Sequence, residues 1–212
     1  RGRRFVMFPL VRILIGLIFV LGSIVLWQIG IKIIVDNFYG GEKLPLYGAI
    51  LVYLSMTLIV ILSYYLFVRW VERRSLKELP RPGAWKEFGI GSGIGFGLMS
   101  SVTVILWVLG YYQVSAFSAV TVLLRPLFDS IFAGFFEEIA FRGIIFRIIN
   151  ESLGSWIAIF LSAFLFGFAH AANPNASLFS SIAIAVEAGI LLSAAYLFTQ
   201  RLWMVIGIHF AW

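Results

Sequence analysis

Cysteine is absent from this chain and charged residues are scarce. Without cysteine there can be no disulfide, no thiolate nucleophile and no cysteine-ligated metal. Only 12% of the residues are charged, against about 25% in soluble domains, whereas 61% are hydrophobic and the mean hydropathy is +1.00. A chain of 212 residues has too little interior to bury so much apolar surface in water. The composition therefore indicates a protein that resides in a lipid bilayer.

Hydrophobic runs long enough to cross a bilayer divide the chain into about seven predicted helices. They cover 9–31, 46–68, 88–110, 119–149, 155–172 and 178–198, with a seventh beginning near 203. We therefore predict an all-α, polytopic transmembrane bundle. The seventh run reaches Trp212 after about ten residues, roughly half of a bilayer core, so we expect the natural protein to continue beyond this residue.

The net charge of +6 lies in short segments between the predicted spans and not in a long basic stripe. We therefore predict contact with the bilayer and no nucleic-acid partner. Basic residues cluster before the first span and in the loop 69–87, and alternating helices place both segments on one side, together with Arg147 and Arg201. By the positive-inside rule that side is cytoplasmic, which predicts a multi-pass protein of the cell membrane with a cytoplasmic N-terminus.

Glycine recurs at every second position early in the third predicted span, at 89, 91, 93, 95 and 97. Small residues four positions apart allow two membrane helices to approach closely, so we predict a tight helix contact here. A nucleotide-binding glycine loop is excluded because no strand precedes these residues.

Ionisable side chains within predicted spans cost several kcal/mol each and are functional candidates, and we single out six of them in the fourth to seventh predicted spans. They include both histidines of the chain: Glu137, Glu138, Arg142, His170, Glu187 and His209.

Helical geometry separates the two adjacent glutamates. Glu138 and Arg142 are four residues apart and can neutralise each other on one helix face, whereas Glu137 points about 100° away and has no partner in its own helix. At about 1.5 Å per residue, Glu137, His170 and His209 lie at similar depths, on the order of 10–25 Å from the cytoplasmic ends of their helices. A purely structural alternative remains open, in which the histidines are packing residues and Glu187 pairs with Arg142 or Arg147.

The order of these residues resembles a known family. Glu-Glu-x-x-x-Arg at 137–142, Phe-x-x-x-His at 166–170 and a later histidine at His209 resemble the CAAX-protease and bacteriocin-processing family, also called CPBP or Abi, of intramembrane endopeptidases, which includes the type 2 CAAX prenyl protease. The third motif of the family ends in Asn or Asp, one residue beyond Trp212. The resemblance covers 119–212, which we predict to be the catalytic helical core, and 1–118 supplies the N-terminal helices and the basic cytoplasmic loop.

The resemblance implies hydrolysis of peptide bonds in membrane-bound or lipidated substrates. It assigns water activation to Glu137 and His170 and oxyanion stabilisation to His209, with Glu138 and Arg142 completing the catalytic set. Glu137, His170 and His209 are also an acceptable zinc set, so a Zn²⁺ metalloprotease and a metal-free glutamate–histidine pair both stay open.

A different class of function also stays open: a non-enzymatic membrane protein of immunity, scaffold or proton-coupled transport type. Transporters usually contain inverted repeats, and the sequence shows none.

Overall fold

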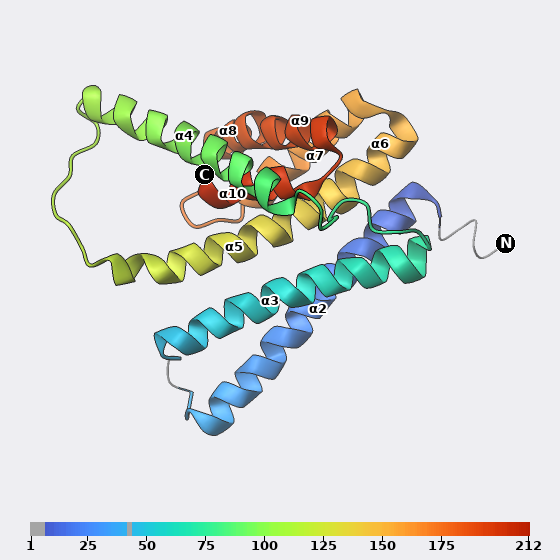
Figure 1. The fold of residues 1–212 in the computed structure, drawn as a ribbon, viewed down its shortest axis with the longest axis horizontal. Coiled ribbons are helices and arrows are strands. Elements are labelled where there is room, and N and C mark those ends of the chain that lie inside the picture. The colour runs from blue at the N-terminus through green and yellow to red at the C-terminus, as the bar shows by residue number, and fades with distance from the viewer. Residues whose placement is uncertain (1–6, 42–43) are drawn as a thin grey trace.

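A computed structural model describes residues 7–41 and 44–212, and these residues form helices and connections with no strand (Figure 1). The all-α prediction is therefore confirmed. The helices, including three π-helical segments and one 3₁₀ segment, are α2 (Pro9–Phe38), α3 (Leu46–Leu66) with η1 (Phe67–Glu72), α4 (Ala84–Val108), η2 (Val120–Leu123), α5 (Leu124–Glu138) with η3 (Ile139–Phe146) and α6 (Arg147–Leu153), α7 (Ser155–His170), α8 (Leu178–Ile184) with η4 (Ala185–Gly189) and α9 (Ile190–Thr199), and α10 (Leu202–Ala211).

Each of the seven predicted runs coincides with a helix or a continuous set of helical segments. Four are long and apolar enough to cross a membrane: α2, α3 with η1, α4, and α8 through α9. Helices α7 and α10 are apolar but shorter. The chain is therefore an integral membrane protein, and the count of seven spans stays a prediction.

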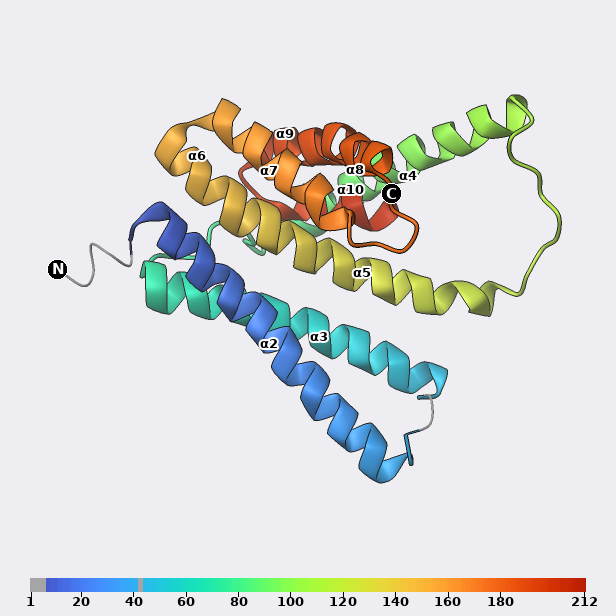
Figure 2. The ribbon, with the colours of Figure 1, turned by 180° about the vertical axis from the view of Figure 1, so that it is seen from behind.

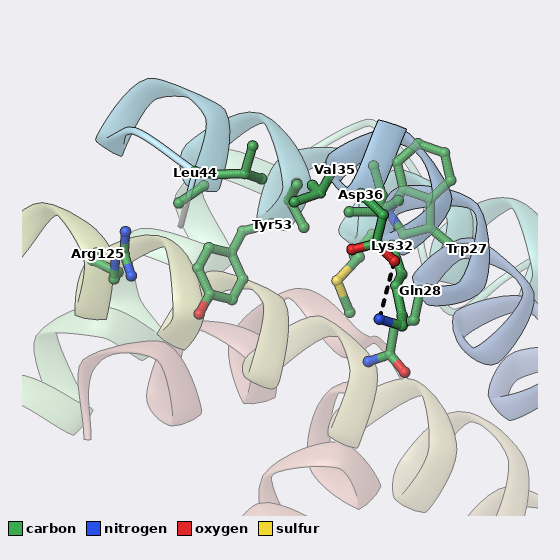
Figure 3. Close-up of a pocket in the computed structure, with 12 residues that line it drawn as sticks. Trp27, Gln28, Lys32, Val35, Asp36, Leu44, Tyr53 and Arg125 are labelled. Atoms are coloured by element: carbon green, nitrogen blue, oxygen red, sulfur yellow. Dashed lines mark hydrogen bonds and ion pairs between the residues drawn. The ribbon is translucent and has the colours of Figure 1, made fainter. Parts of the chain in front are cut away.

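The helices divide into a diverging pair and a more compact group. Figures 1 and 2 show α2 and α3 leaving the other helices towards their short connection, while a long connection joins α4 to α5. Where α2 and α3 face the start of α5 there is a cavity of about 460 Å³, whose lining includes Trp27, Tyr53 and Arg125 (Figure 3). The C-terminal helix α10 lies within the compact group, against α4, α5 and α9.

Glycines bring α4 and α10 into backbone contact. A Cβ atom at Gly91 would collide with the carbonyl oxygen of Met204, one at Gly95 with that of Ile208, and one at Gly207 with that of Phe88. The predicted close approach is therefore present, but only two of the five α4 glycines make it, because Gly91 and Gly95 are one helical turn apart. A Cβ added at any of the other three would meet no atom within 4 Å. This contact positions the helix that carries His209.

Ion pairs join three segments at one end of the bundle. Glu72, whose side chain is only 2% exposed, contacts Arg12 of α2 at 3.0 Å and Arg147 of α6 at 2.8 Å. The complete network consists of Arg12, Glu72, Arg74, Glu78, Arg147 and Glu151. In the sequence Arg147 was an orientation signal and a possible partner of Glu187; in the structure Arg12 and Arg147 fasten α2 and α6 to the end of η1.

Candidate active site

Three helical segments bring the predicted site residues together. Glu137 and Glu138 end α5, and Arg142 follows in η3 of the same continuous helix. His170 is the last residue of α7, and His209 lies near the end of α10. Residues that are far apart in sequence thus meet in one polar cluster inside an apolar bundle.

A buried chain of charge-assisted contacts runs from Arg142 through Glu138 to His209. Arg142 Nη1 donates to Glu138 Oε1 at 2.9 Å, and both side chains are 0% exposed. The same oxygen lies 2.7 Å from His209 Nδ1. Arg142 Nη2 also donates to the carbonyl of Gly189 at 3.3 Å, which connects the pair to η4. The predicted Glu138–Arg142 pair is therefore present, and it additionally orients a histidine that the family resemblance assigned only to the oxyanion.

Glu137 faces away from this pair, towards the two imidazoles. Its Oε2 lies 3.7 Å from Nε2 of His170 and 3.8 Å from Nε2 of His209. These separations are too long for direct hydrogen bonds. Oε2 is buried and has no hydrogen-bond partner among the described residues, although the side chain as a whole is 21% exposed. A polar contact of this length suits a bridging water.

The hydrogen bonds of His170 indicate its tautomer. Its Nδ1 lies 2.8 Å from the carbonyl oxygen of Phe166, an atom that can only accept. In the neutral ring Nδ1 therefore carries the hydrogen, and Nε2, which faces Glu137, holds the free lone pair. Two acceptors, Glu137 Oε2 and His170 Nε2, thus face each other across a gap.

Charge counting suggests a different state for His209. The cluster contains two carboxylates and one guanidinium, so one additional proton on an imidazole makes it neutral, which low-polarity surroundings favour. His209 is the histidine that contacts the Glu138 carboxylate directly. As an imidazolium it would donate from both ring nitrogens.

Phe166 is a site residue that the sequence indicates only as part of the Phe-x-x-x-His motif. Its ring is buried, with its centroid 4.6 Å from that of His170 and 6.1 Å from that of His209. The Arg142 guanidinium carbon lies 4.4 Å from the same centroid, a cation–π arrangement. One aromatic ring therefore separates the arginine from His170 and sets the spacing of both histidines. Its place in the Phe-x-x-x-His motif was the available signal.

Two cavities reach the cluster from different sides, and His170 lines both. One, of about 290 Å³, lies between α5, α7, η4 and α10 and also exposes His209. The other, of about 380 Å³, lies between α2, α5 and α7 and exposes Glu137, with Asn173 at its edge. A substrate segment therefore has space next to the carboxylate and next to the histidines.

Glu187 does not belong to the cluster. Its side chain is exposed on η4 and forms no ion pair with a described residue. The alternative in which Glu187 pairs with Arg142 or Arg147 is therefore wrong: Arg142 pairs with Glu138, and Arg147 pairs with Glu72 and Glu151. The backbone carbonyls of η4, and not its glutamate, meet the arginine.

The described side chains include no group of three or more His, Asp or Glu residues placed to hold a metal ion. For Glu137, His170 and His209, the predicted zinc set, the oxygen–nitrogen separations of 3.7 and 3.8 Å exceed the roughly 3.4 Å between ligand atoms of a tetrahedral zinc. The residues as placed do not fit the ion.

Fold and site together define a class: a helical integral membrane protein with a buried carboxylate–imidazole centre. Residues 119–212 match the family described as type II CAAX prenyl endopeptidase Rce1-like. This match over the C-terminal part of the chain supports the resemblance to the CAAX-protease family that the sequence motifs carry, and it indicates a protease. No curated protein and no solved structure matches the chain.

Proposed function

We propose that the protein is an intramembrane endopeptidase that hydrolyses peptide bonds of membrane-associated substrates with a water activated by Glu137 and His170. The observation that carries the proposal is the pair of facing acceptors, Glu137 Oε2 and His170 Nε2, 3.7 Å apart. A water between them donates one hydrogen to each, which directs an oxygen lone pair towards the scissile carbonyl.

The reaction then needs three further events. The water oxygen bonds to the carbonyl carbon, and its proton passes to the Glu137–His170 pair. The carbonyl oxygen becomes an oxyanion, which His209 stabilises by donating from Nε2 while Glu138 holds Nδ1. The stored proton moves to the amide nitrogen, the carbon–nitrogen bond breaks, and a carboxylic acid and an amine leave.

The test is cleavage of membrane-embedded peptides by purified protein in proteoliposomes. Glu137→Gln keeps the shape of the side chain but removes the base, so we expect the rate to fall by about 10²–10⁴. Glu187→Gln is the matched control, because this glutamate is exposed and lies outside the cluster; its rate should equal that of the wild type. Equal rates for the wild type and Glu137→Gln would refute the proposal.

Zinc is tested in the same assay. Because the described donors do not fit a metal ion, we expect prolonged chelation to leave the rate unchanged. Loss of activity on chelation and its return with added Zn²⁺ would instead support the metalloprotease alternative, with Glu137, His170 and His209 rearranged as ligands.

A further inference from the structure

A groove of about 730 Å³ lies at the end of the bundle that carries the ion-pair network, separate from the two cavities at the active site. One wall is a face of α3 and η1, and the other is formed by the 74–81 segment and the start of α10. Its lining contains three arginines and no carboxylate, with apolar and aromatic side chains making up most of the remainder.

The α3–η1 wall changes from apolar to cationic along its length. Leu58, Leu62, Tyr65 and Arg69 recur at the spacing of one helix face, over about 16 Å from first to last. The two leucines are 66% and 54% exposed and the tyrosine is 45% exposed, so this face has no protein partner in the described part of the chain. This order matches an anionic phospholipid: the apolar part of the wall suits an acyl chain, and the cationic end suits the negatively charged headgroup.

The opposite wall is held in place by hydrogen bonds. Trp203 Nε1 donates to the carbonyl of Pro80 at 2.8 Å, and the backbone N–H of Leu202 donates to the carbonyl of Glu78 at 2.8 Å. Arg201 also donates to the carbonyl of Pro82. These contacts fix the segment that carries Arg81, so the groove is formed before any ligand arrives, which lowers the entropy cost of binding.

The cationic end of the groove retains unused charge. No described carboxylate lies within ion-pair distance of Arg69 or Arg81, whereas Arg74 is paired with Glu72 and Glu78. Arg74 nevertheless has a buried Nη2 without a hydrogen-bond partner among the described residues. The lining of the groove thus contains two uncompensated guanidinium groups, and Arg74 adds one buried, unused donor.

We propose that this groove binds an anionic phospholipid. The phosphate and headgroup lie between Arg69 and Arg81, beside Arg74, and one acyl chain follows Leu62 and Leu58. Basic pockets at the ends of membrane helices bind acidic headgroups in this way. A free phosphate would leave the apolar wall unused, and a zwitterionic choline headgroup would bring a cation against the arginines.

Binding is measured by titrating the purified, delipidated protein in detergent with phosphatidylglycerol or phosphatidylcholine and counting bound lipids by native mass spectrometry. We expect phosphatidylglycerol to bind more tightly. Arg69→Gln/Arg81→Gln should weaken its binding by roughly 30-fold, since each basic residue beside an anionic lipid contributes a factor of about five. The matched control is Lys77→Gln/Lys86→Gln, which removes the same charge from exposed positions nearby that do not line the groove.

The outcomes are separable. Equal affinity for both lipids, or an equal loss in the lysine control, would overturn the proposal. Displacement of the lipid by inorganic phosphate at the same concentration would also overturn the proposal. The groove would then be a phosphate site to which the apolar wall contributes nothing. Thermal unfolding of both double variants identifies any folding defect, and the single Arg81→Gln variant, at an exposed position, then supplies the comparison.

Discussion

At the scale of single residues, two adjacent glutamates have opposite surroundings. Glu138 is fully buried between Arg142 and His209, whereas Glu137 lines one of the two cavities and faces the histidine Nε2 atoms. The 100° between neighbours on a helix produces this difference. One carboxylate therefore holds the site together, and the other is free to act on a water.

This difference predicts opposite effects of the same substitution. Glu138→Gln leaves Arg142 as an uncompensated charge that is 0% exposed, which typically costs about 3–5 kcal/mol. We expect a clear fall in the thermal unfolding temperature in detergent. Glu137→Gln removes no ion pair with an arginine and should unfold near the wild-type temperature. Equal unfolding temperatures for Glu138→Gln and the wild type would show that the pair does not stabilise the fold.

Helical geometry alone was sufficient to predict the Glu138–Arg142 pair and the separate position of Glu137. It was not sufficient for the contacts between helices. That Phe166 lies between the arginine and the histidines, and that Glu187 points outward, depend on how α7 and η4 rotate against α5. Rotation about a helix axis is decided by packing, and an almost uniformly apolar helix such as α7 gives little periodic signal for it.

At the scale of helices, the boundaries follow from apolar run length, because a chain in lipid must satisfy its backbone hydrogen bonds within each segment. Hence each predicted run begins within about four residues of an observed helix, whereas α2 continues well beyond the predicted end at 31, to Phe38. The π-helical segments η1, η3 and η4 were not predicted. Such widened turns depend on local tertiary contacts, and one of them, η3, begins directly after Glu138 and carries Arg142.

The α4–α10 contact predicts a position-specific effect of added methyl groups. Gly91→Ala places a Cβ against the backbone of α10, so that α10 must shift and carry His209 with it. We expect a loss of about 1–3 kcal/mol in the free energy of unfolding and a slower cleavage rate. Gly93→Ala is the matched control: it has open space at the same helix and should be neutral or stabilising by up to about 1 kcal/mol. Similar unfolding temperatures for the two variants would contradict a tight α4–α10 contact.

The ion-pair network predicts a pH-dependent stability. Glu151 lies in α6, beyond the predicted span that ends at 149. Burial alone would raise the pKa of its carboxyl, but hydrogen bonds from Arg12 and Arg147 and their charges hold this pKa below the ordinary value of 4.5. A depressed folded-state pKa stabilises the protein above the unfolded-state value, and this contribution is lost as the pH falls through the folded-state value.

Thermal unfolding of the wild type and of Glu151→Gln at several pH values measures this contribution of the Glu151 carboxylate to stability. The variant should unfold at a lower temperature near pH 7, and the gap should close as the pH falls below about 4.5. Asp36→Asn is the control, because its pair with Lys32 is solvent-exposed and should contribute little at either pH. A gap for Glu151→Gln that stays constant on acidification would mean that the carboxylate charge is not responsible.

At the scale of the whole molecule, basic side chains gather at one end of the bundle. Arg12, Arg147 and the loop after η1 meet through Glu72, and Arg201 contacts Pro80 and Pro82. This gathering was expected from alternating helices. Carboxylates neutralise part of the charge, but acidic residues contribute little to membrane orientation, so this end is still expected to be cytoplasmic.

The loops on the two sides of α4 test the orientation of the molecule. Helix α4 has 25 residues, about 37 Å, enough to cross a hydrocarbon core of about 30 Å, so the loops before and after it lie on opposite sides. Ser75 precedes α4 and Ser115 follows it, and both are exposed. Because the chain has no cysteine, Ser75→Cys and Ser115→Cys each introduce a single label site. With a membrane-impermeant maleimide on intact cells, Ser115→Cys should react at once and Ser75→Cys only after permeabilisation. The reverse pattern would show that the orientation is inverted. Labelling of both variants from outside would show that α4 does not cross the membrane.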